Sequence, residues 1–328
     1  LIFLNDITKA YRGEKLATES YSGYEVVLNE QKLRKGDYYT KAKAYYTDLL
    51  SDAHCNSLPA GDLRESGRER AETIEYVSSN VTAEAVEQFC TDHKLGMNAF
   101  FTAVFGLVLA KYCGADTPAF ASIYNGRSDS RLSDTVSMLV KTLPVVSKIS
   151  DGEKTVTAYV SEMGKQLVDS MSMDIYSFAE ISRELSANAE VMFAYQGSEF
   201  VFDSLCDAPA VMHELRLDSA KAPLNVNVFL KKNQICWVCE YNGDRFSQAY
   251  IEGFAQALEK AAEEFLTKTA IKEISILSDR AKEQINRFNQ TDCPMEDLTC
   301  HRLLARSAAV HADKKAVICA DKSYTYKE

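Results

Sequence analysis

The most constraining feature of the sequence is an apolar run from Ala99 to Ala110, in which only Thr102 and Gly106 depart from large apolar or alanine side chains. The run is well short of the roughly 20 residues needed to cross a membrane. A helix drawn through residues 99–112 is apolar nearly all round, and such a helix is stable only when it is buried. The chain must therefore enclose this helix between other elements of structure.

The segments around this helix alternate between helical and strand patterns. Asn98 is placed to cap the helix and Gly114 to end it. Period-two alternation predicts strands at 224–230 and 235–241, joined by a hairpin turn. Together the elements predict an α/β fold, a two-layer sandwich with helices packed on a mixed sheet. We further expect helices at 38–50, 83–95, 153–170, 178–186 and 247–266, and strands at 73–77, 118–124, 190–196 and 212–217, with a linker at 57–70.

Charge and cysteine content limit the class of protein. The 37 Lys and Arg residues are outnumbered by 47 Asp and Glu, which gives a net charge of -10. This acidic balance argues against a nucleic-acid partner and against an anionic membrane surface. Nine scattered cysteines favour reduced thiols and a cytoplasmic location. The first residues have no signal-peptide pattern, and the start at Leu1 suggests a piece of a longer protein.

Local motifs give no catalytic or metal site. Cys236 and Cys239 form a CxxC inside a predicted strand, where positions three apart point to opposite faces. No second CxxC or nearby histidine pair completes a zinc site. The five histidines form no HExxH motif or adjacent pair, and no phosphate-binding glycine motif is present. We therefore predict neither catalytic residues nor a metal site within these residues.

The segment 100–146 suggests a family. Its order of buried helix, turn, strand, Asn-Gly-Arg and a loop ending in SMLVKTLPV resembles the condensation domains of nonribosomal peptide synthetases, whose corresponding loop ends in GMFVNTLP. The matching residues are Gly126, Arg127, Met138, Val140, Thr142, Leu143 and Pro144. The departures are Ser137 for Gly, Leu139 for Phe, Lys141 for Asn and Val146 for Arg.

Other segments resemble the same family in the same order. Tyr176-Ser177-Phe178 is similar to its YPF element, with Ser177 in place of proline and Met173 in place of a preceding histidine. Residues 191–196 and 240–246 are similar to two later strand motifs. Residues 289–328 resemble the opening of an adenylation domain, including the strand SYTYKE.

The resemblance implies a fold and a reaction. Condensation domains are pseudo-dimers of two chloramphenicol-acetyltransferase-like subdomains around a tunnel. A donor acyl or peptidyl thioester and an acceptor aminoacyl thioester enter on the 4′-phosphopantetheine arms of carrier domains, and an amide forms. The expected partners are upstream and downstream carrier domains and the adjoining adenylation domain, with no directly bound cofactor. The expected organisation is 1–70 for the end of the first subdomain and a linker, 71–278 for the second subdomain, and 279–328 for a linker and the start of the adenylation domain.

The family's HHxxxDG motif is absent from these 328 residues, so we expect the chain to be an inactive fragment. The resemblance places six residues along the tunnel or the subdomain seam, with the loop 128–144 reaching toward the N-terminal segment as part of the tunnel floor. Lys141 could select an acidic substrate or be a surface lysine. Gly126 could simply allow a turn, Arg127 could be an ion-pair partner, and Thr-Leu-Pro could be a strand end. The six residues that the resemblance places along the tunnel or the seam are Gly126, Arg127, Met138, Lys141, Thr142 and Pro144.

Two other functions remain open at this stage. An epimerisation domain has the same fold, although the adenylation-like tail argues against it. A non-catalytic platform for docking carrier proteins is the alternative of a different class.

Overall fold

The computed structural model describes residues 2–64, 67, 70–198, 204–206, 208–211, 218–293 and 299–328. The chain divides into two compact units, Leu1–Ser278 and Asp279–Glu328, and each is described by itself. The predicted strand 212–217 lies outside the described residues.

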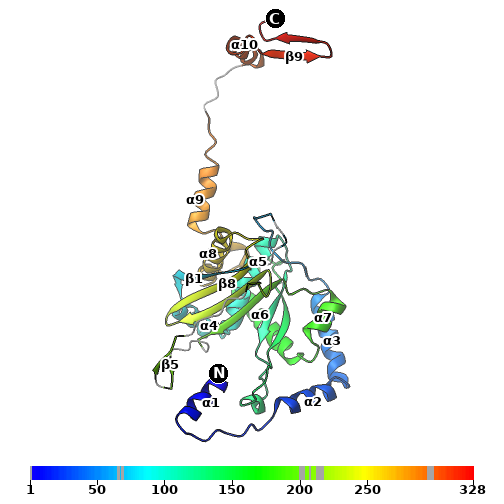
Figure 1. Ribbon diagram of the computed structural model, residues 1–328, viewed down its shortest axis with the longest axis vertical. Helices are drawn as coiled ribbons and strands as arrows, with labels where there is room; N and C mark the ends of the chain where they lie inside the picture. Colours follow the sequence, from blue (N-terminus) through cyan, green and yellow to red (C-terminus); the bar gives the residue numbers. More distant parts are fainter. Residues whose placement is uncertain are drawn as a thin grey trace. The chain divides into compact units, whose positions relative to one another are not determined.

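The described part of the first unit is built on a mixed six-stranded sheet in the order β1-β8-β7-β4-β2-β3 (Figure 1). Strand β4 is parallel to both β2 and β7, whereas the other neighbours are antiparallel. The mixed sheet confirms the predicted α/β class. The strands are β1 (Ala71–Thr82), β2 (Ala119–Tyr124), β3 (Lys141–Val146), β4 (Val191–Gly197), β7 (Leu224–Lys231) and β8 (Gln234–Asn242).

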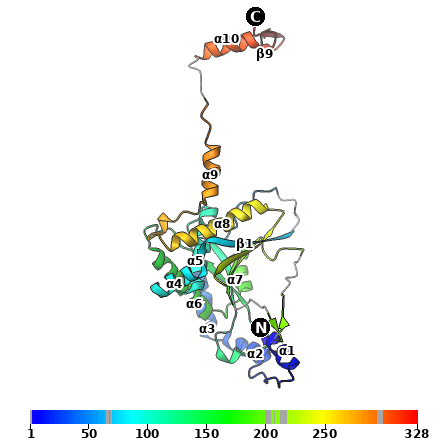
Figure 2. The ribbon, with the colours of Figure 1, turned by 90° about the vertical axis from the view of Figure 1, so that its left-hand side faces the viewer.

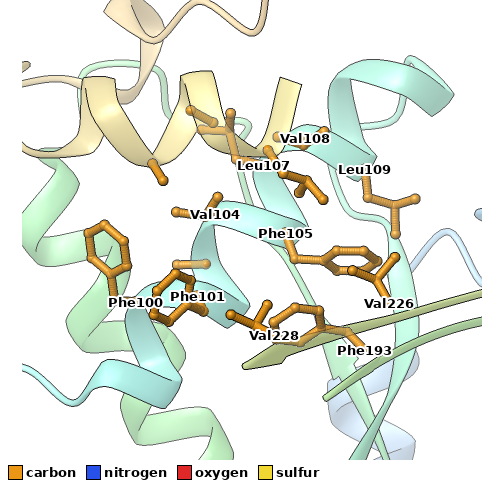
Figure 3. Close-up of a cluster of buried hydrophobic side chains, with 14 of the residues drawn as sticks. Phe100, Phe101, Val104, Phe105, Leu107, Val108, Leu109, Phe193, Val226 and Val228 are labelled. Carbon is orange, nitrogen blue, oxygen red and sulfur yellow. The ribbon is translucent and has the colours of Figure 1, made fainter. Parts of the chain in front are cut away.

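The apolar run forms helix α5 (Met97–Cys113), in which every residue from Ala99 to Ala110 is buried. The helix lies on the sheet, and the Phe105 ring stacks on the Phe193 ring of β4 with centroids 4.7 Å apart (Figure 3). Val226 of β7 belongs to the same cluster. Burying a large apolar side chain contributes about 1.5–3 kcal/mol, so this cluster is the main source of stability in the first unit.

The two ends of α5 agree only in part with the prediction. Gly114 ends the helix in the left-handed conformation, as predicted, with a φ of 60°. The predicted Asn98 cap is wrong, because the N-cap is Gly96 and Asn98 lies within the first turn. There the Asn98 Oδ1 accepts a hydrogen bond from Thr102 Oγ1 at 3.2 Å. The helix begins early because Met97 also packs against the core and extends the apolar face.

Three further helices surround α5. They are α4 (Ala83–His93), α6 (Val156–Ser172) and α8 (Gln248–Phe265). Figure 2 shows α8 running along β1, and α8 also packs on α5. Thr82 caps α4 and Ser247 caps α8 through their hydroxyl oxygens. Helix α6 begins at Val156 rather than at 153, because the Thr155 hydroxyl caps it.

The β2–β3 end of the sheet is covered on its other face as well. Phe120 and Val145 face the α5 cluster, whereas Ala119 and Val146, each one position away, belong to a second buried cluster. Helices α3 (Asp37–Leu50) and α7 (Phe178–Leu185) supply most of the other residues of this cluster. The N-terminal residues before the predicted linker therefore pack directly on this sheet.

Strand β1 is longer than the predicted 73–77 and includes a register shift between Val77 and Thr82. The shift is stabilised by Glu259 of α8, whose carboxylate accepts hydrogen bonds from the backbone N–H groups of Ser79 and Asn80 and from the Tyr76 hydroxyl. The polar segment Ser78-Ser79-Asn80 has no alternation of apolar residues that would predict a strand. The contact with Glu259 explains why the strand extends through it.

The remaining elements of the first unit are short or exposed. Helix α1 (Ile2–Tyr11) and helix α2 (Gly23–Leu33) have no buried residue, and Ser22 caps α2 in a capping box with Glu25. The pair β5 (Ser204–Leu205) and β6 (Ala208–Pro209) forms a separate antiparallel hairpin. Two 3-10 turns, η1 and η2, span Ser130–Leu132 and Ile271–Glu273.

The described part of the second unit contains two helices and a hairpin. Helices α9 (Asp279–Phe288) and α10 (Cys300–Val310) precede β9 (Lys315–Cys319) and β10 (Lys322–Thr325), which pair antiparallel. For the whole described part of the chain, no single helix has the length and apolar composition to cross a membrane. One bent pair, α4 with α5 at 106°, meets that criterion jointly.

Candidate functional site

The predicted site residues begin at a tight turn after β2. Gly126 has a φ of +69°, and a Cβ built there would lie 1.9 Å from the carbonyl oxygen of Leu139. The Arg127 backbone N–H donates to Asn125 Oδ1 at 3.0 Å, which closes the turn. Gly126 is therefore required both by the left-handed backbone and by the close approach of the chain that returns at Leu139. We call residues 128–140 between these two segments the floor loop.

Arg127, the residue just before the floor loop, holds the loop together through hydrogen bonds to its backbone. Its guanidinium donates to the carbonyl oxygens of Leu132, Thr135 and Ser137, with Nη2 lying 3.0 Å from the Thr135 oxygen. These partners of Arg127 are backbone carbonyl groups, not the carboxylate of the ion pair considered from the sequence. Five N–H donors in a planar fork suit this arrangement, and lysine could not reproduce it.

The middle of the floor loop is bound to the N-terminal segment. Thr135 Oγ1 donates to the carbonyl oxygen of Tyr21 at 2.5 Å, and the Val136 N–H donates to Glu19 Oε1 at 2.7 Å. The Arg131 guanidinium lies 4.7 Å from the centre of the Tyr21 ring. These contacts confirm that the loop reaches toward the N-terminal segment. Its role as a tunnel floor stays a prediction.

Three apolar side chains of the floor loop are exposed. Met138 is 86% exposed, and Val136 and Val140 are also exposed at alternating positions. Next to them, Gly23 at the start of α2 lies so close that a Cβ there would be 2.8 Å from Ser137 Cβ. The loop therefore presents a row of three exposed apolar side chains beside α2.

Strand β3 follows the floor loop and holds the last three predicted residues. Lys141 Nζ contacts Glu30 Oε1 at 2.7 Å and Asp174 Oδ2 at 3.2 Å, so Lys141 is neither a free surface lysine nor an unpaired charge for a substrate. Thr142 is half-buried opposite Ile123, and Pro144 is buried opposite Ala121. A proline is tolerated here because β3 is at the edge of the sheet.

A row of ion pairs joins the N-terminal helices to α7, and sequence reasoning missed it. Arg34, beside α2, donates to both carboxylate oxygens of Glu180, which also accepts from the Tyr39 hydroxyl at 2.8 Å. One turn further, Glu184 Oε2 accepts from Lys43 at 2.6 Å and from the Tyr176 hydroxyl at 2.8 Å. The partners are far apart in sequence, so only the capping box between Ser177 and Glu180 could have been recognised.

These contacts set the ionisation of both carboxyl groups. Burial opposes the charge of Glu180, but hydrogen bonds from Arg34, Ser177 and Tyr39 outweigh it and lower its pKa to about 2. Hydrogen bonds from Lys43, Tyr176 and Arg183 lower the pKa of Glu184 to about 2. Because the folded pKa values lie below the ordinary 4.5, both groups stabilise the docking of α3 on α7 above pH 4.5.

We expect this docking to weaken as the pH falls from 4.5 toward 2. The Tyr39 and Tyr176 rings, with centroids 5.5 Å apart, give a near-ultraviolet circular dichroism signal that should report the change. The matched control is the double variant Glu180→Gln/Glu184→Gln, in which the signal should be nearly flat over the same range. An unchanged pH profile in that variant would contradict the assignment.

Among the described residues, no group of three His, Cys, Asp or Glu side chains could hold a metal ion. The four described histidines are exposed. Cys239 faces the main core and Cys236 the opposite side of β8, as predicted, and burial raises the pKa of each thiol to about 12. A surface hollow of about 320 Å³ lies at the opposite edge of the sheet, between β1 and α8.

A family model described as "Condensation domain" matches residues 1–286. The chain is 26% identical to surfactin synthase subunit 1 of Bacillus subtilis and 23% identical to tyrocidine synthase 3 of Brevibacillus parabrevis. Both alignments cover 100% of the chain, but only 10% and 5% of these relatives.

Solved structures give the same fold. Holo-AB3403, a four-domain nonribosomal peptide synthetase bound to AMP and glycine, superposes with a TM-score of 0.78 at 16% identity, over 100% of this chain and 27% of that one. The epimerization domain from the third module of tyrocidine synthetase B gives 0.65 at 16% identity, over 81% of this chain and 65% of that one. These likenesses and the mixed sheet confirm the predicted chloramphenicol-acetyltransferase-like fold. The chain belongs to the condensation domain family of the nonribosomal peptide synthetases.

Proposed function

We propose that this chain is part of an enzyme that forms an amide between a donor acyl or peptidyl thioester and an acceptor aminoacyl thioester. The observation that carries the proposal is the floor loop, which matches the resembled motif at Met138 and Val140, lies within the matched residues 1–286, and is bound to the N-terminal segment by Thr135 and Val136. The alignments with peptide synthetases over the whole chain support it. Carrier proteins would present both substrates on 4′-phosphopantetheine, and the domain itself would need no cofactor.

In this reaction the acceptor amine attacks the donor carbonyl carbon, the C–N bond forms, and the C–S bond breaks. The amine proton passes to the released thiolate. The amine must be neutral and about 3–3.5 Å from the carbonyl, and a tunnel that holds both thioesters supplies this proximity and limits hydrolysis. No adjacent histidine pair occurs in the 328 residues. We therefore assign the base that receives or orients the amine proton to an HHxxxDG segment elsewhere in the full-length protein.

The predicted site residues would shape the tunnel rather than perform chemistry. Gly126 and Arg127 fix the path of the floor loop, and Met138 provides an exposed apolar contact. Thr142 and Pro144 continue the floor into β3. In this proposal their substitution changes the rate by changing the position of the substrates.

We also propose an organisation for the parent protein. Residues 1–70 would complete a first subdomain, 71–278 would form the second, and 279–328 would open an adenylation domain. The separate unit that begins at Asp279 supports the second boundary, whereas residues 1–278 form one compact unit. The partners would be the adjoining adenylation domain and the carrier domains on either side, and the acidic, thiol-containing composition supports a cytoplasmic location.

Epimerisation is the second candidate, because an epimerization domain is among the similar folds. Full-length protein, incubated with loaded donor and acceptor carriers, separates the two by mass spectrometry and chiral analysis. We expect an amide-linked thioester on the acceptor carrier. Inverted donor without amide would favour epimerisation, and unchanged thioesters would favour the docking platform. The isolated 328-residue chain should give no more product than carriers alone.

A further inference from the structure

The floor loop is fixed to the rest of the first unit at three places. Arg127 holds its beginning and its turn through carbonyl oxygens. Thr135 and Val136 hold its middle against residues 19–21. The third place is Lys141, the first residue of β3, where the loop ends.

Lys141 joins two elements that are distant in sequence. Its ammonium group lies 2.7 Å from Glu30 Oε1 of α2, 3.2 Å from Asp174 Oδ2 and 3.4 Å from the Asp174 carbonyl oxygen. An ammonium has three N–H donors, so these acceptors use its full capacity. The Lys141 side chain is 26% exposed. Burial opposes its charge, but Glu30 and Asp174 outweigh that effect and raise its pKa.

The two carboxylates also depend on Lys141. Both lie within ion-pair distance of one ammonium, so they face each other across it. Without the ammonium they would repel each other, and α2 and the segment before α7 would separate. Helix α2 has no buried residue, so its position depends on polar contacts: this bridge, the pair between Arg34 and Glu180, and the hydrogen bonds of residues 19–21 to the floor loop.

We propose that Lys141 is a positioning residue for amide formation, because its bridge between Glu30 and Asp174 sets the position of the floor loop relative to α2. This inference rests on the proposed function. Lys141 touches no reacting atom; it acts through the loop that precedes it. Lysine stands here in place of the asparagine of the resembled motif, and Glu30 and Asp174 provide the two carboxylates that pair with its charge.

The test uses the full-length protein and the variants Lys141→Met, Lys141→Arg and Lys148→Met. Lys148 is an exposed lysine just beyond the other end of β3 and serves as the matched control. Hydrogen exchange of residues 128–140 reports the position of the loop without requiring any reaction. Amide formation is then measured at about 0.05 M and about 0.5 M salt, because a partly exposed ion pair is screened by salt.

We expect Lys141→Met to raise exchange in residues 128–140 by about tenfold and to leave α5 unchanged, a size typical of coupled neighbouring residues. The same variant should have a kcat lower by a similar factor, with little change in the KM for the carriers. Raising the salt concentration should lower the activity of the wild type but not that of Lys141→Met. Lys141→Arg should recover most of both effects, and Lys148→Met should behave as the wild type.

Unchanged exchange in Lys141→Met, or equal effects of Lys148→Met, would overturn the proposal. If Lys141→Met does not fold, Glu30→Gln removes one pair and keeps Asp174, and increased exchange in residues 128–140 and α2 is then required. If no variant or wild type forms an amide, the proposed function fails, whereas the exchange data still decide whether Lys141 positions the loop.

Discussion

Replacing Gly126 with alanine should lower the free energy of unfolding of the first unit by about 3 kcal/mol. Part of this cost is the left-handed backbone at φ +69°, and the larger part is the contact that a Cβ would make with the Leu139 carbonyl oxygen at 1.9 Å. The atom in the way is backbone, so the floor loop must move. Urea unfolding can be followed by the fluorescence of Trp237, the single tryptophan, which is fully buried.

Gly114 provides the matched control for this prediction. Its φ is +60°, and no atom lies within 4 Å of a Cβ built there. Gly114→Ala should therefore cost only the backbone strain, about 1 kcal/mol. Equal costs at the two positions would mean that the contact with Leu139 does not constrain the turn.

Glu259 should be the most sensitive charged residue of α8. Its side chain is buried at 3% exposure and accepts hydrogen bonds from Tyr76, Ser79 and Asn80 of β1. Glu259→Met keeps the side-chain volume but removes the acceptor of three partly buried hydrogen bonds, and we expect a loss of about 3 kcal/mol in the free energy of unfolding. The same urea experiment measures it.

Two substitutions on the same helix complete this test. Glu259→Gln keeps one acceptor oxygen and should recover part of the loss. Glu263 pairs with Lys260 at 3.0 Å in a partly exposed position, so Glu263→Ala should cost less than about 0.5 kcal/mol. A cost for Glu259→Met as small as that for Glu263→Ala would show that the β1 shift does not depend on the carboxylate.

The fold was predictable for those elements whose own residue pattern shows which of their faces must be buried. The Ala99–Ala110 run required enclosure, and the alternation in 224–230 required a half-buried strand; both are observed. Strand β1 was underestimated, because its last residues are polar and depend on Glu259 from the far end of the chain. Glu259 itself lies between apolar positions of α8, and no periodicity distinguishes it from a solvated residue.

For the candidate site, the sequence predicted which positions belong to it but not which contacts their side chains make. The order of motifs identified Gly126, Arg127 and the residues of β3, and the turn at Gly126 follows from ordinary backbone rules. The partners of Lys141 could not be read, since Glu30 is 111 residues away and Asp174 is 33 residues away. The carbonyl partners of Arg127 could not be predicted either, because every residue has the same backbone acceptor and the sequence does not show which ones an arginine will bind.

The most direct test of this account is to map where the substrate arm passes. A donor carrier is loaded with an acyl-phosphopantetheine that has a photoreactive diazirine near the thioester, bound to the full-length protein and irradiated. Peptide mass spectrometry should place crosslinks of this chain within residues 126–144, with Met138 and Thr142 among the labelled positions. Crosslinks confined to other regions, such as the hollow between β1 and α8 lined by Thr73, Tyr76 and Glu252, would contradict the claim that the floor loop lines the substrate path.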